Sequence, residues 1–346
     1  MSILKAAVLR KPYDIVIQDV PMPRINRDEV LIKIGACSIC GSDIHAYHGH
    51  GDDQVIYPTI LGHEIAGVVA EIGEEVEGVK MGERVSADDD LTCGKCRWCL
   101  SGRPNLCADR HTLGARFDGG YAEYVKVPAK NLHRIPENVP FEHACVGQTL
   151  GIGYHGVVDR GNVQPGEFVV VIGAGPVGLS ALAVSKVFEA KVLITDVVPY
   201  RLEAAKKMGA DYVVDSSKED LVKEVMNLTK NEGADKVFEC VGGRAHETTL
   251  RQAVDVVRAA GRIVNFGAVS EPYMQINLGK ISRWEIEFTS TRGVVHRIGA
   301  TLNLMGEGKI NVEPMVTHVL PLEDVKRGIE LMDKKLENAV KVALKP

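Results

Sequence analysis

The sequence lacks several features that mark large classes of proteins. Its net charge is only −5 over 346 residues, of which 25% are charged, so we expect neither a nucleic-acid partner nor an electrostatic membrane anchor. It has no internal repeat and no low-complexity segment. Hydrophobic residues make up 45% of the chain, which is ample for buried cores, and the length predicts two domains rather than one.

The sequence also lacks a long unbroken apolar run and an export signal. Residues 1–10 alternate like a first strand and have neither the apolar stretch nor the cleavage site of a signal peptide. Glycine, proline and serine interrupt the most apolar segment, residues 168–187, so no membrane span is expected. Without a sign of export, the eight cysteines are expected to be reduced thiols, and we predict a cytoplasmic protein.

Two patterns of secondary structure divide the chain. Up to about residue 130, short apolar runs such as 30–34 and 65–72 are punctuated by Gly, Pro and Asp and predict a mainly β domain. Beyond residue 165, β-branched runs alternate with helical stretches, which predicts a parallel, doubly wound sheet over residues 150–292. The predicted strands are 168–172, 192–195, 212–214, 236–239, 262–266 and 286–290, and the predicted helices are 177–187, 200–208, 218–227 and 248–257. The tail, with a helix over 322–334 and a strand over 339–344, is expected to return to the first domain.

A first metal site is predicted from Cys40-Gly-Ser-Asp-Ile-His45 and Gly62-His-Glu64. Sulfur and nitrogen ligands favour zinc over magnesium or calcium, and a catalytic zinc takes three protein ligands and keeps one position open. The predicted ligands are Cys40, His63 and Glu64. Cys40 or His63 alone would more simply be a core residue, but their occurrence together favours a metal site.

Four further cysteines lie close together in the sequence. They are Cys93, Cys96, Cys99 and Cys107. Four thiolates at this spacing can close a tetrahedron around a second zinc without an open position, so this site is expected to be structural. Paired disulfides are the alternative, but they would be strained in so short a segment.

A glycine-rich segment follows the predicted strand 168–172. Its residues are Gly173, Ala174, Gly175, Pro176, Val177 and Gly178. Between a strand and a helix, this pattern predicts a dinucleotide site in which the backbone approaches a pyrophosphate at a helix N-terminus. Asp196 ends the next predicted strand, where its carboxylate would accept hydrogen bonds from ribose hydroxyls, which favours NAD over NADP. The nearby Arg201 complicates that choice, and Asp196 could also be a simple strand-end carboxylate.

Two zinc-type sites followed by a nucleotide fold resemble the zinc-dependent medium-chain dehydrogenases across essentially the whole chain. Gly62-His-Glu-Ile-Ala-Gly67 resembles the family's zinc signature, and residues 195–201 are most similar to the sorbitol, L-iditol, butanediol and threonine dehydrogenases. The resemblance implies a GroES-like catalytic domain of residues 1–149 and 293–346 and a Rossmann NAD-binding domain of residues 150–292. It also implies a homo-oligomer, more often a tetramer than a dimer.

The resemblance implies roles for individual residues as well. Asp43 is expected to orient His63, and Ser42 and His45 are expected to relay the proton that the substrate releases. Further contacts near the cofactor are implied for Val241, Gly267, Ala268, Arg292 and Lys341. Arg292 and Lys341 could instead be solvated surface charges.

One position departs from the family pattern. Relatives usually have Cys or Glu where this chain has Gln148, and a neutral amide is a poor zinc ligand. We therefore predict that Cys40, His63 and Glu64 hold the zinc while Gln148 lies behind them, although the third ligand stays open between Glu64 and Gln148.

The function predicted from these features is zinc-dependent transfer of a hydride from a secondary alcohol, such as a polyol, to NAD. The expected cofactors are two zinc ions per chain and NAD, and the expected partner is a small alcohol substrate. L-threonine 3-dehydrogenase is an alternative within the family. A non-catalytic, NAD-binding structural protein is an alternative of another class.

Overall fold

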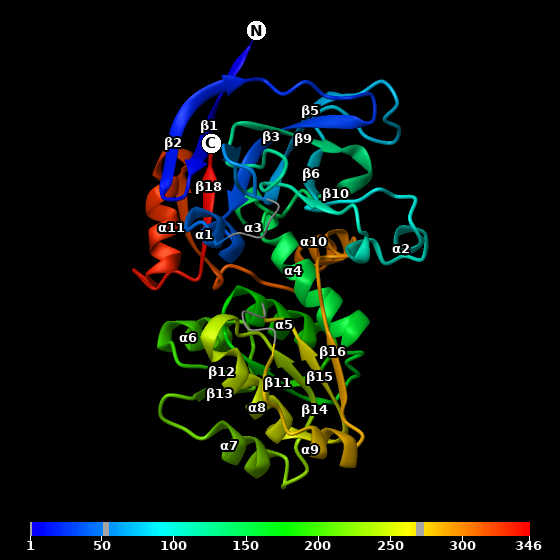
Figure 1. Cartoon of the computed structure of the whole chain (residues 1–346), viewed down its shortest axis with the longest axis vertical. Helices are drawn as coiled ribbons and strands as arrows, with labels where there is room; N and C mark the ends of the chain where they lie inside the picture. The colour runs from blue at the N-terminus through cyan, green and yellow to red at the C-terminus, as the bar shows by residue number, and fades with distance from the viewer. Residues whose placement is uncertain (1, 51–54, 268–272) are drawn as a thin grey trace. The chain divides into compact units, whose positions relative to one another are not determined.

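The computed structural model describes residues 2–50, 55–267 and 273–346, which form two compact units (Figure 1). Unit 1 consists of Met1–Gly151, Val294–Gly308 and Val316–Pro346. Unit 2 consists of Ile152–Gly293 and Lys309–Met315. None of the helices in these described ranges is long and apolar enough to cross a membrane.

Unit 2 contains a parallel sheet with the strand order β13-β12-β11-β14-β15-β16. Its strands are β11 (Phe168–Ile172), β12 (Lys191–Asp196), β13 (Tyr212–Asp215), β14 (Ala234–Glu239), β15 (Val257–Asn265) and β16 (Glu287–Ser290). The order is that of a Rossmann fold. The chain adds strands on one side of β11 as far as β13, and then crosses to the other side of β11 and adds β14 to β16 there. This arrangement confirms the predicted doubly wound sheet, with β14 and β15 beginning earlier than their sequence patterns indicate.

Helices cover the sheet of unit 2 (Figure 1). They are α5 (Pro176–Val187), α6 (Pro199–Lys207), α7 (Leu221–Leu228), α8 (His246–Val256) and α9 (Leu278–Arg283). Helices α5 and α6 pack on each other and on β11 to β13, whereas α7 packs on α8, which lies against β14 and β15. Coverage of both faces explains why β11 is an almost uninterrupted run of buried valine and isoleucine rather than an alternating strand.

Unit 1 is mainly β structure, as the sequence predicts. Its larger sheet has the order β10-β6-β5-β3-β18-β17, with β9 added on β3, and smaller sheets are β2-β1-β4 and β7-β8. The strands are β1 (Ile3–Lys11), β2 (Asp14–Pro21), β3 (Glu29–Ser38), β4 (Thr59–Ile60), β5 (Glu64–Ile72), β6 (Arg84–Ala87), β7 (Asp90–Leu91), β8 (His111–Thr112), β9 (Tyr124–Pro128), β10 (Leu132–Arg134), β17 (Val316–Pro321) and β18 (Lys341–Lys345). The helices are α1 (Gly41–Tyr47), α2 (Arg97–Leu100), α3 (Phe141–Ala144), α4 (Gly147–Tyr154), α10 (Ile298–Gly306) and α11 (Val325–Asp333).

The C-terminal strand β18 positions residues from distant parts of the sequence. It pairs antiparallel with β3, so the tail returns to the first domain as expected. In the shared register Ala343 lies opposite Ser38, and Ser38 lies opposite Glu64 at the start of β5. The sheet therefore brings the end of the chain beside the predicted metal ligands.

Candidate active site

The three predicted ligands of the first metal site lie together in unit 1. Donor atoms of Cys40, His63 and Glu64 are within 4.8 Å of one another. Cys40 caps the N-terminus of α1, while His63 and Glu64 stand at the entry to β5. Gly62 before them has φ +94°, and a Cβ there would lie 2.4 Å from the ring of Tyr121, so this turn requires glycine.

Asp43 holds the imidazole of His63 as the family resemblance implies. Its Oδ1 lies 3.5 Å from Nδ1 of His63, and its Oδ2 accepts hydrogen bonds from the Cys40 N–H at 2.9 Å and the Tyr121 hydroxyl at 2.7 Å. Burial alone would raise the pKa of Asp43, but the neighbouring His63 and these donors bring it below its ordinary value. With Nδ1 directed at a carboxylate, the Nε2 atom of His63 is the one available to a metal.

Glu64 is surrounded by partners in the interior of unit 1. Its Oε1 is 2.6 Å from Nζ of Lys341 and accepts a hydrogen bond from Thr149 at 3.0 Å, while Ser38 donates to Oε2. Burial by itself would lower the pKa of Lys341, but Glu64 together with Cys40 and Asp43 outweighs that effect and brings the pKa above its ordinary value. The Lys341 side chain is only 2% exposed, so it is not a surface charge. Its ammonium pairs with Glu64, and a contact with the cofactor stays a prediction.

Gln148 has a neighbour that sequence reasoning missed. Gln148 is buried with its side chain near Asp89, and no described residue hydrogen-bonds to its Oε1. Asp89 is buried close to His63, and burial together with the charge of Asp90 raises the pKa of Asp89 to about 7. The amide nitrogen of Gln148 can donate to this carboxylate, which leaves the amide oxygen free to accept or ligate.

Ser42 and His45 lie one turn apart on α1, and both are exposed. Residues spaced by three positions share one face of a helix, so the two side chains can take part in one chain of hydrogen bonds. Ser42 follows the ligand Cys40 closely, whereas His45 is further along toward the solvent. This placement is compatible with the proton relay implied by the resemblance.

The four cysteines of the second site also converge. The Sγ atoms of Cys96 and Cys99 are 3.6 Å apart, those of Cys93 and Cys107 are 3.5 Å apart, and all four donor atoms lie within 4.8 Å of one another. These separations are too long for disulfides but close to the edge of about 3.8 Å expected for thiolates around one zinc. The N–H groups of Lys95 and Cys96 lower the pKa of Cys93 to about 6, which favours its thiolate form.

The glycine-rich segment of unit 2 forms a tight turn between β11 and α5. Gly173 has φ +98°, and a Cβ on Gly178 would lie 1.8 Å from the Gly173 carbonyl oxygen, so the helix can approach the strand only without a side chain there. Asp196 accepts hydrogen bonds from the Ala174 N–H at 2.7 Å and the Val198 N–H at 2.9 Å, and its Oδ2 is 3.8 Å from Nη1 of Arg201. Asp196 and Arg201 therefore lie beside the turn, where the sequence places them.

Two further predicted cofactor residues gather at the same edge of the sheet. A Cβ on Gly173 would meet the Val241 side chain at 2.7 Å, and one on Gly267 would meet the Val241 carbonyl oxygen at 2.3 Å. These segments follow the carboxyl ends of β11, β14 and β15, where open α/β sheets bind ligands. Arg292 follows β16, and Ala268 lies outside the described residues. Glu239, which the sequence did not single out, is fully buried there, and its burial raises its pKa to about 7.

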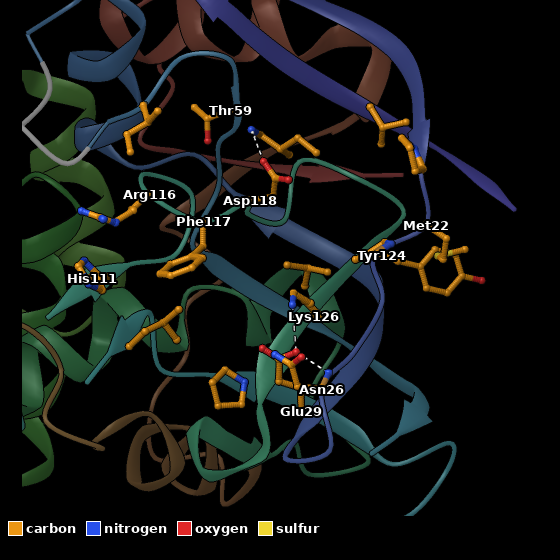
Figure 2. A pocket seen from close by; sticks show the side chains of 18 of the residues that line it. Met22, Asn26, Glu29, Thr59, His111, Arg116, Phe117, Asp118, Tyr124 and Lys126 are labelled. Carbon is orange, nitrogen blue, oxygen red and sulfur yellow. Dashed lines mark hydrogen bonds and ion pairs between the residues drawn. The ribbon is translucent and has the colours of Figure 1, made fainter. Parts of the chain in front are cut away.

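A cavity of about 950 Å³ lies elsewhere in unit 1, beside the β1–β2 hairpin and the segment 109–118 (Figure 2). Its labelled acidic groups are already engaged, because Asp118 accepts from the Ile60 N–H at 3.1 Å and Glu29 pairs with Lys126 at 3.0 Å. The described residues that line it do not include Cys40, His63 or Glu64. The candidate chemistry therefore lies at the metal-type cluster and not in this larger hollow.

Comparison with known proteins agrees with both units. Residues 26–137 match the family described as alcohol dehydrogenase GroES-like domain, and residues 176–307 match the family described as zinc-binding dehydrogenase. The chain is 35% identical to a sorbitol dehydrogenase from Bacillus subtilis, covering 99% of this chain and 97% of that protein. It is 37% identical to an L-threonine 3-dehydrogenase from Bacillus licheniformis, covering 91% of each.

A solved structure extends this similarity to three dimensions. An alcohol dehydrogenase from Escherichia coli CFT073, solved in complex with NADH, matches with a TM-score of 0.91 and 32% identity over 100% of both chains. The GroES-like and Rossmann parts expected from the resemblance are thus confirmed as the fold class. The chain belongs to the zinc-dependent medium-chain alcohol dehydrogenases.

Proposed function

We propose that the chain oxidises a secondary alcohol to a ketone with NAD as acceptor, and that its substrate is a polyol, a sugar alcohol or a related compound with neighbouring oxygens. The observation that carries the proposal is the cluster of Cys40, His63 and Glu64, because three donors leave a coordination position open. The relatives named for sorbitol and for threonine support the same class, since both of those compounds carry a secondary hydroxyl.

The donor set fits zinc. It combines a thiol, an imidazole directed by Asp43 and a carboxylate, and the unpartnered Oε1 of Gln148 offers a further acceptor beside Asp89. The chemistry that bound zinc would supply here is lowering the pKa of the substrate hydroxyl, and the chemistry that NAD would supply is acceptance of the hydride. The second cluster, with four cysteines, would hold a structural zinc, which makes two per chain.

Residues of the chain itself would orient the metal ligands and carry the proton that the substrate releases. Asp43 and Tyr121 fix the orientation of His63, which sets the direction of the open position. Ser42 would accept the proton from the substrate hydroxyl and His45 would pass it to solvent. Lys341 limits the negative charge of Glu64, so that the site does not oppose the loss of that proton.

NAD is the favoured cofactor because of the turn at Gly173. Asp196 is bound to that turn through the Ala174 N–H, so its carboxylate sits where ribose hydroxyls would be held and a 2′-phosphate would be repelled. Arg201 is 3.8 Å from this carboxylate and is thereby partly neutralised. Val241, Gly267 and Arg292 remain proposed contacts toward the rest of the cofactor.

A metal analysis decides the third ligand. We expect Glu64→Ala to lose one equivalent of zinc and Gln148→Ala to retain it, because an ionised carboxylate is the better ligand. Thr149→Val is the matched control, since it removes only a hydrogen bond to Glu64. If the Glu64 variant keeps its zinc while the Gln148 variant loses one, the assignment is inverted and Gln148 is the ligand.

A substrate screen tests the reaction. Threonine, sorbitol, xylitol, inositols, butanediol and phosphorylated polyols would each be supplied with NAD while NADH absorbance is recorded. Turnover of a polyol supports the proposal, and preferential turnover of threonine supports the threonine dehydrogenase alternative. A fully metallated protein that forms NADH from none of them would support the non-catalytic alternative.

We also propose the roles of the two units, the oligomeric state and the cellular location. The two compact units would be the catalytic and nucleotide-binding domains, and the chain would form a homo-oligomer, a tetramer in preference to a dimer. The free cysteines at metal spacing favour a reducing, cytoplasmic location. Sedimentation of the purified protein would measure its oligomeric state.

A further inference from the structure

A third group of metal-type side chains lies in unit 1, apart from both clusters described above. Donor atoms of Asp88, His133 and His296 are within 4.8 Å of one another. They come from three separate segments: the end of β6, the middle of β10 and the segment that precedes α10. Neither the predicted function nor the glycine and cysteine motifs account for them.

The contacts within this group are short but do not make a complete hydrogen-bond network. Nε2 of His133 lies 3.0 Å from Oδ1 of Asp88, yet neither atom has a hydrogen-bond partner of acceptable geometry among the described residues. The other carboxylate oxygen of Asp88 contacts Nδ1 of His296. The Asp88 side chain is 2% exposed and that of His133 is 14% exposed. This pair is an ion pair when His133 is protonated, and the same converging carboxylate and imidazole atoms can bind one cation when it is not.

Hydrogen bonds hold Asp88 in place, and packing against α10 holds the ring of His133. Asp88 donates its N–H to the Asn131 carbonyl at 2.9 Å, and the Asn131 amide donates back to the Asp88 carbonyl at 3.0 Å. The ring of His133 packs on α10 at Gly299, where a Cβ would lie 3.0 Å from Nδ1 of His133. That contact leaves Nε2 as the atom directed at Asp88.

His296 is presented by an unusual stretch of backbone. Val295 and His296 have φ values of +47° and +58°, a region that a β-branched residue such as valine rarely adopts. Residues in such conformations persist when surrounding contacts determine them, and they are frequent at ligand sites. Here the conformation turns His296 back onto Asp88.

A small cavity adjoins the group. It has a volume of about 10 Å³, and its lining includes Asp88 and His296 together with Val294 and Val295. This is room for about one water-sized particle. The cavity leaves room beside Asp88 and His296, whereas His133 does not line it.

We propose that Asp88, His133 and His296 form a third metal site that binds a divalent transition metal of the zinc class. Two imidazoles and one carboxylate are ligands of zinc and its neighbours rather than of magnesium or calcium. The His296 side chain is 53% exposed, so the metal exchanges with solvent more readily than one held by four cysteines. By joining β6 and β10 to the segment before α10, it fastens residues 294–308 to the rest of unit 1.

Metal content of single variants tests this site in the full-length protein. Wild type, His296→Gln and His133→Gln would be loaded with zinc, dialysed together and measured by mass spectrometry. His318→Gln is the matched control, because His318 faces a single carboxylate, Glu337, at 3.8 Å. We expect both site variants to lose one equivalent relative to wild type and the control to lose none. Equal zinc in wild type and His296→Gln would overturn the proposal and leave an Asp–His ion-pair cluster without metal.

Cobalt substitution gives a second measurement that separates this site from the others. Cobalt at either cysteine-containing site produces thiolate charge-transfer absorption, whereas cobalt held by two imidazoles and a carboxylate does not. The site variants should therefore lose one equivalent of cobalt while their charge-transfer absorption is unchanged. Loss of that absorption in His296→Gln would mean that the missing metal belonged to a cysteine site, which would also overturn the proposal.

Discussion

The buried pair of Lys341 and Glu64 allows a test in which stability reports on the metal site. Lys341→Met keeps much of the side-chain volume but removes the ammonium 2.6 Å from Oε1 of Glu64. Both side chains are at most 2% exposed, so the carboxylate would be left as an uncompensated buried charge. Breaking a buried ion pair from one side costs about 3 to 5 kcal/mol, whereas replacing both partners with neutral residues is close to neutral.

The cost should depend on whether zinc is bound. In metal-free protein we expect the full loss, and we expect Lys341→Met/Glu64→Gln to recover most of it. In zinc-loaded protein the loss should be smaller, because a cation bound by Glu64 would compensate the same carboxylate. The comparison of loaded and free protein therefore measures whether Glu64 faces the metal.

Amide hydrogen exchange measures the stability of unit 1 separately from that of unit 2. Peptides from β3 and β18, which pair with each other, report the opening of the sheet that contains both residues. A loss of 3 to 5 kcal/mol corresponds to exchange that is faster by roughly a hundredfold to a few thousandfold. A change of less than about tenfold in metal-free protein would refute the reasoning about the ion pair. An equal loss with and without zinc would refute the assignment of Glu64 as a ligand.

Three further predictions concern the other sites. Cys96→Ser should lower the unfolding temperature and assembly before it affects hydride transfer, since its thiol belongs to a closed set of four; a variant of normal stability with no hydride transfer would contradict a structural role. Asp196→Ser should reduce the preference for NAD over NADP, measured as the ratio of kcat/KM for the two cofactors, by roughly tenfold or more, and an unchanged ratio would mean that the carboxylate does not face the ribose. Burial raises the pKa of Glu239 to about 7 in the folded protein, so its contribution to stability is complete below its ordinary pKa of 4.5 and is lost as pH rises through 7. Relative to wild type, Glu239→Gln should therefore gain up to about 3 kcal/mol between pH 5 and 8 in urea unfolding without cofactor, and parallel pH profiles would show that Glu239 does not titrate there.

The sequence predicted those parts of the molecule that short-range patterns encode. The glycine turn at the start of α5 needs residues without side chains at fixed spacing, so the spacing of Gly173 and Gly178 is enough to identify it. Likewise, the four cysteines lie on one short segment whose spacing suits a single ion. Cys40 and His63 lie on two separate short motifs, each with residue types that bind zinc. The alternation of strands and helices predicted the parallel sheet, but not the early start of β15, where Ala259, Ala260 and Gly261 have low strand propensity.

Contacts across the larger sheet of unit 1 could not be predicted in this way. Lys341 was expected near the cofactor because its position in the last strand matches cationic groups of relatives. The register of β18 on β3, and of β3 on β5, brings its ammonium to Glu64, a partner that the sequence did not indicate. Sequence reasoning has no measure of register between strands that are so distant along the chain, and a shift by one residue would turn the lysine to the other face. The partners of a buried charge are therefore the information that the structure adds.

The same limit explains why Asp89 was missed and why it matters for the departure at Gln148. Relatives usually have a thiolate or carboxylate at this position, and replacement by an amide removes one negative charge from the site. The structure places the buried carboxylate of Asp89 against the Gln148 side chain and close enough to His63 for their charges to interact. A negative charge is thus available beside the site although the residue at position 148 is neutral. Because burial and Asp90 raise the pKa of Asp89 to about 7, that charge is itself only partly present at neutral pH until a cation favours it. Asp89 therefore offers the site an acidic group that the residue at position 148 lacks, so a neutral Gln148 does not by itself imply the loss of a metal site.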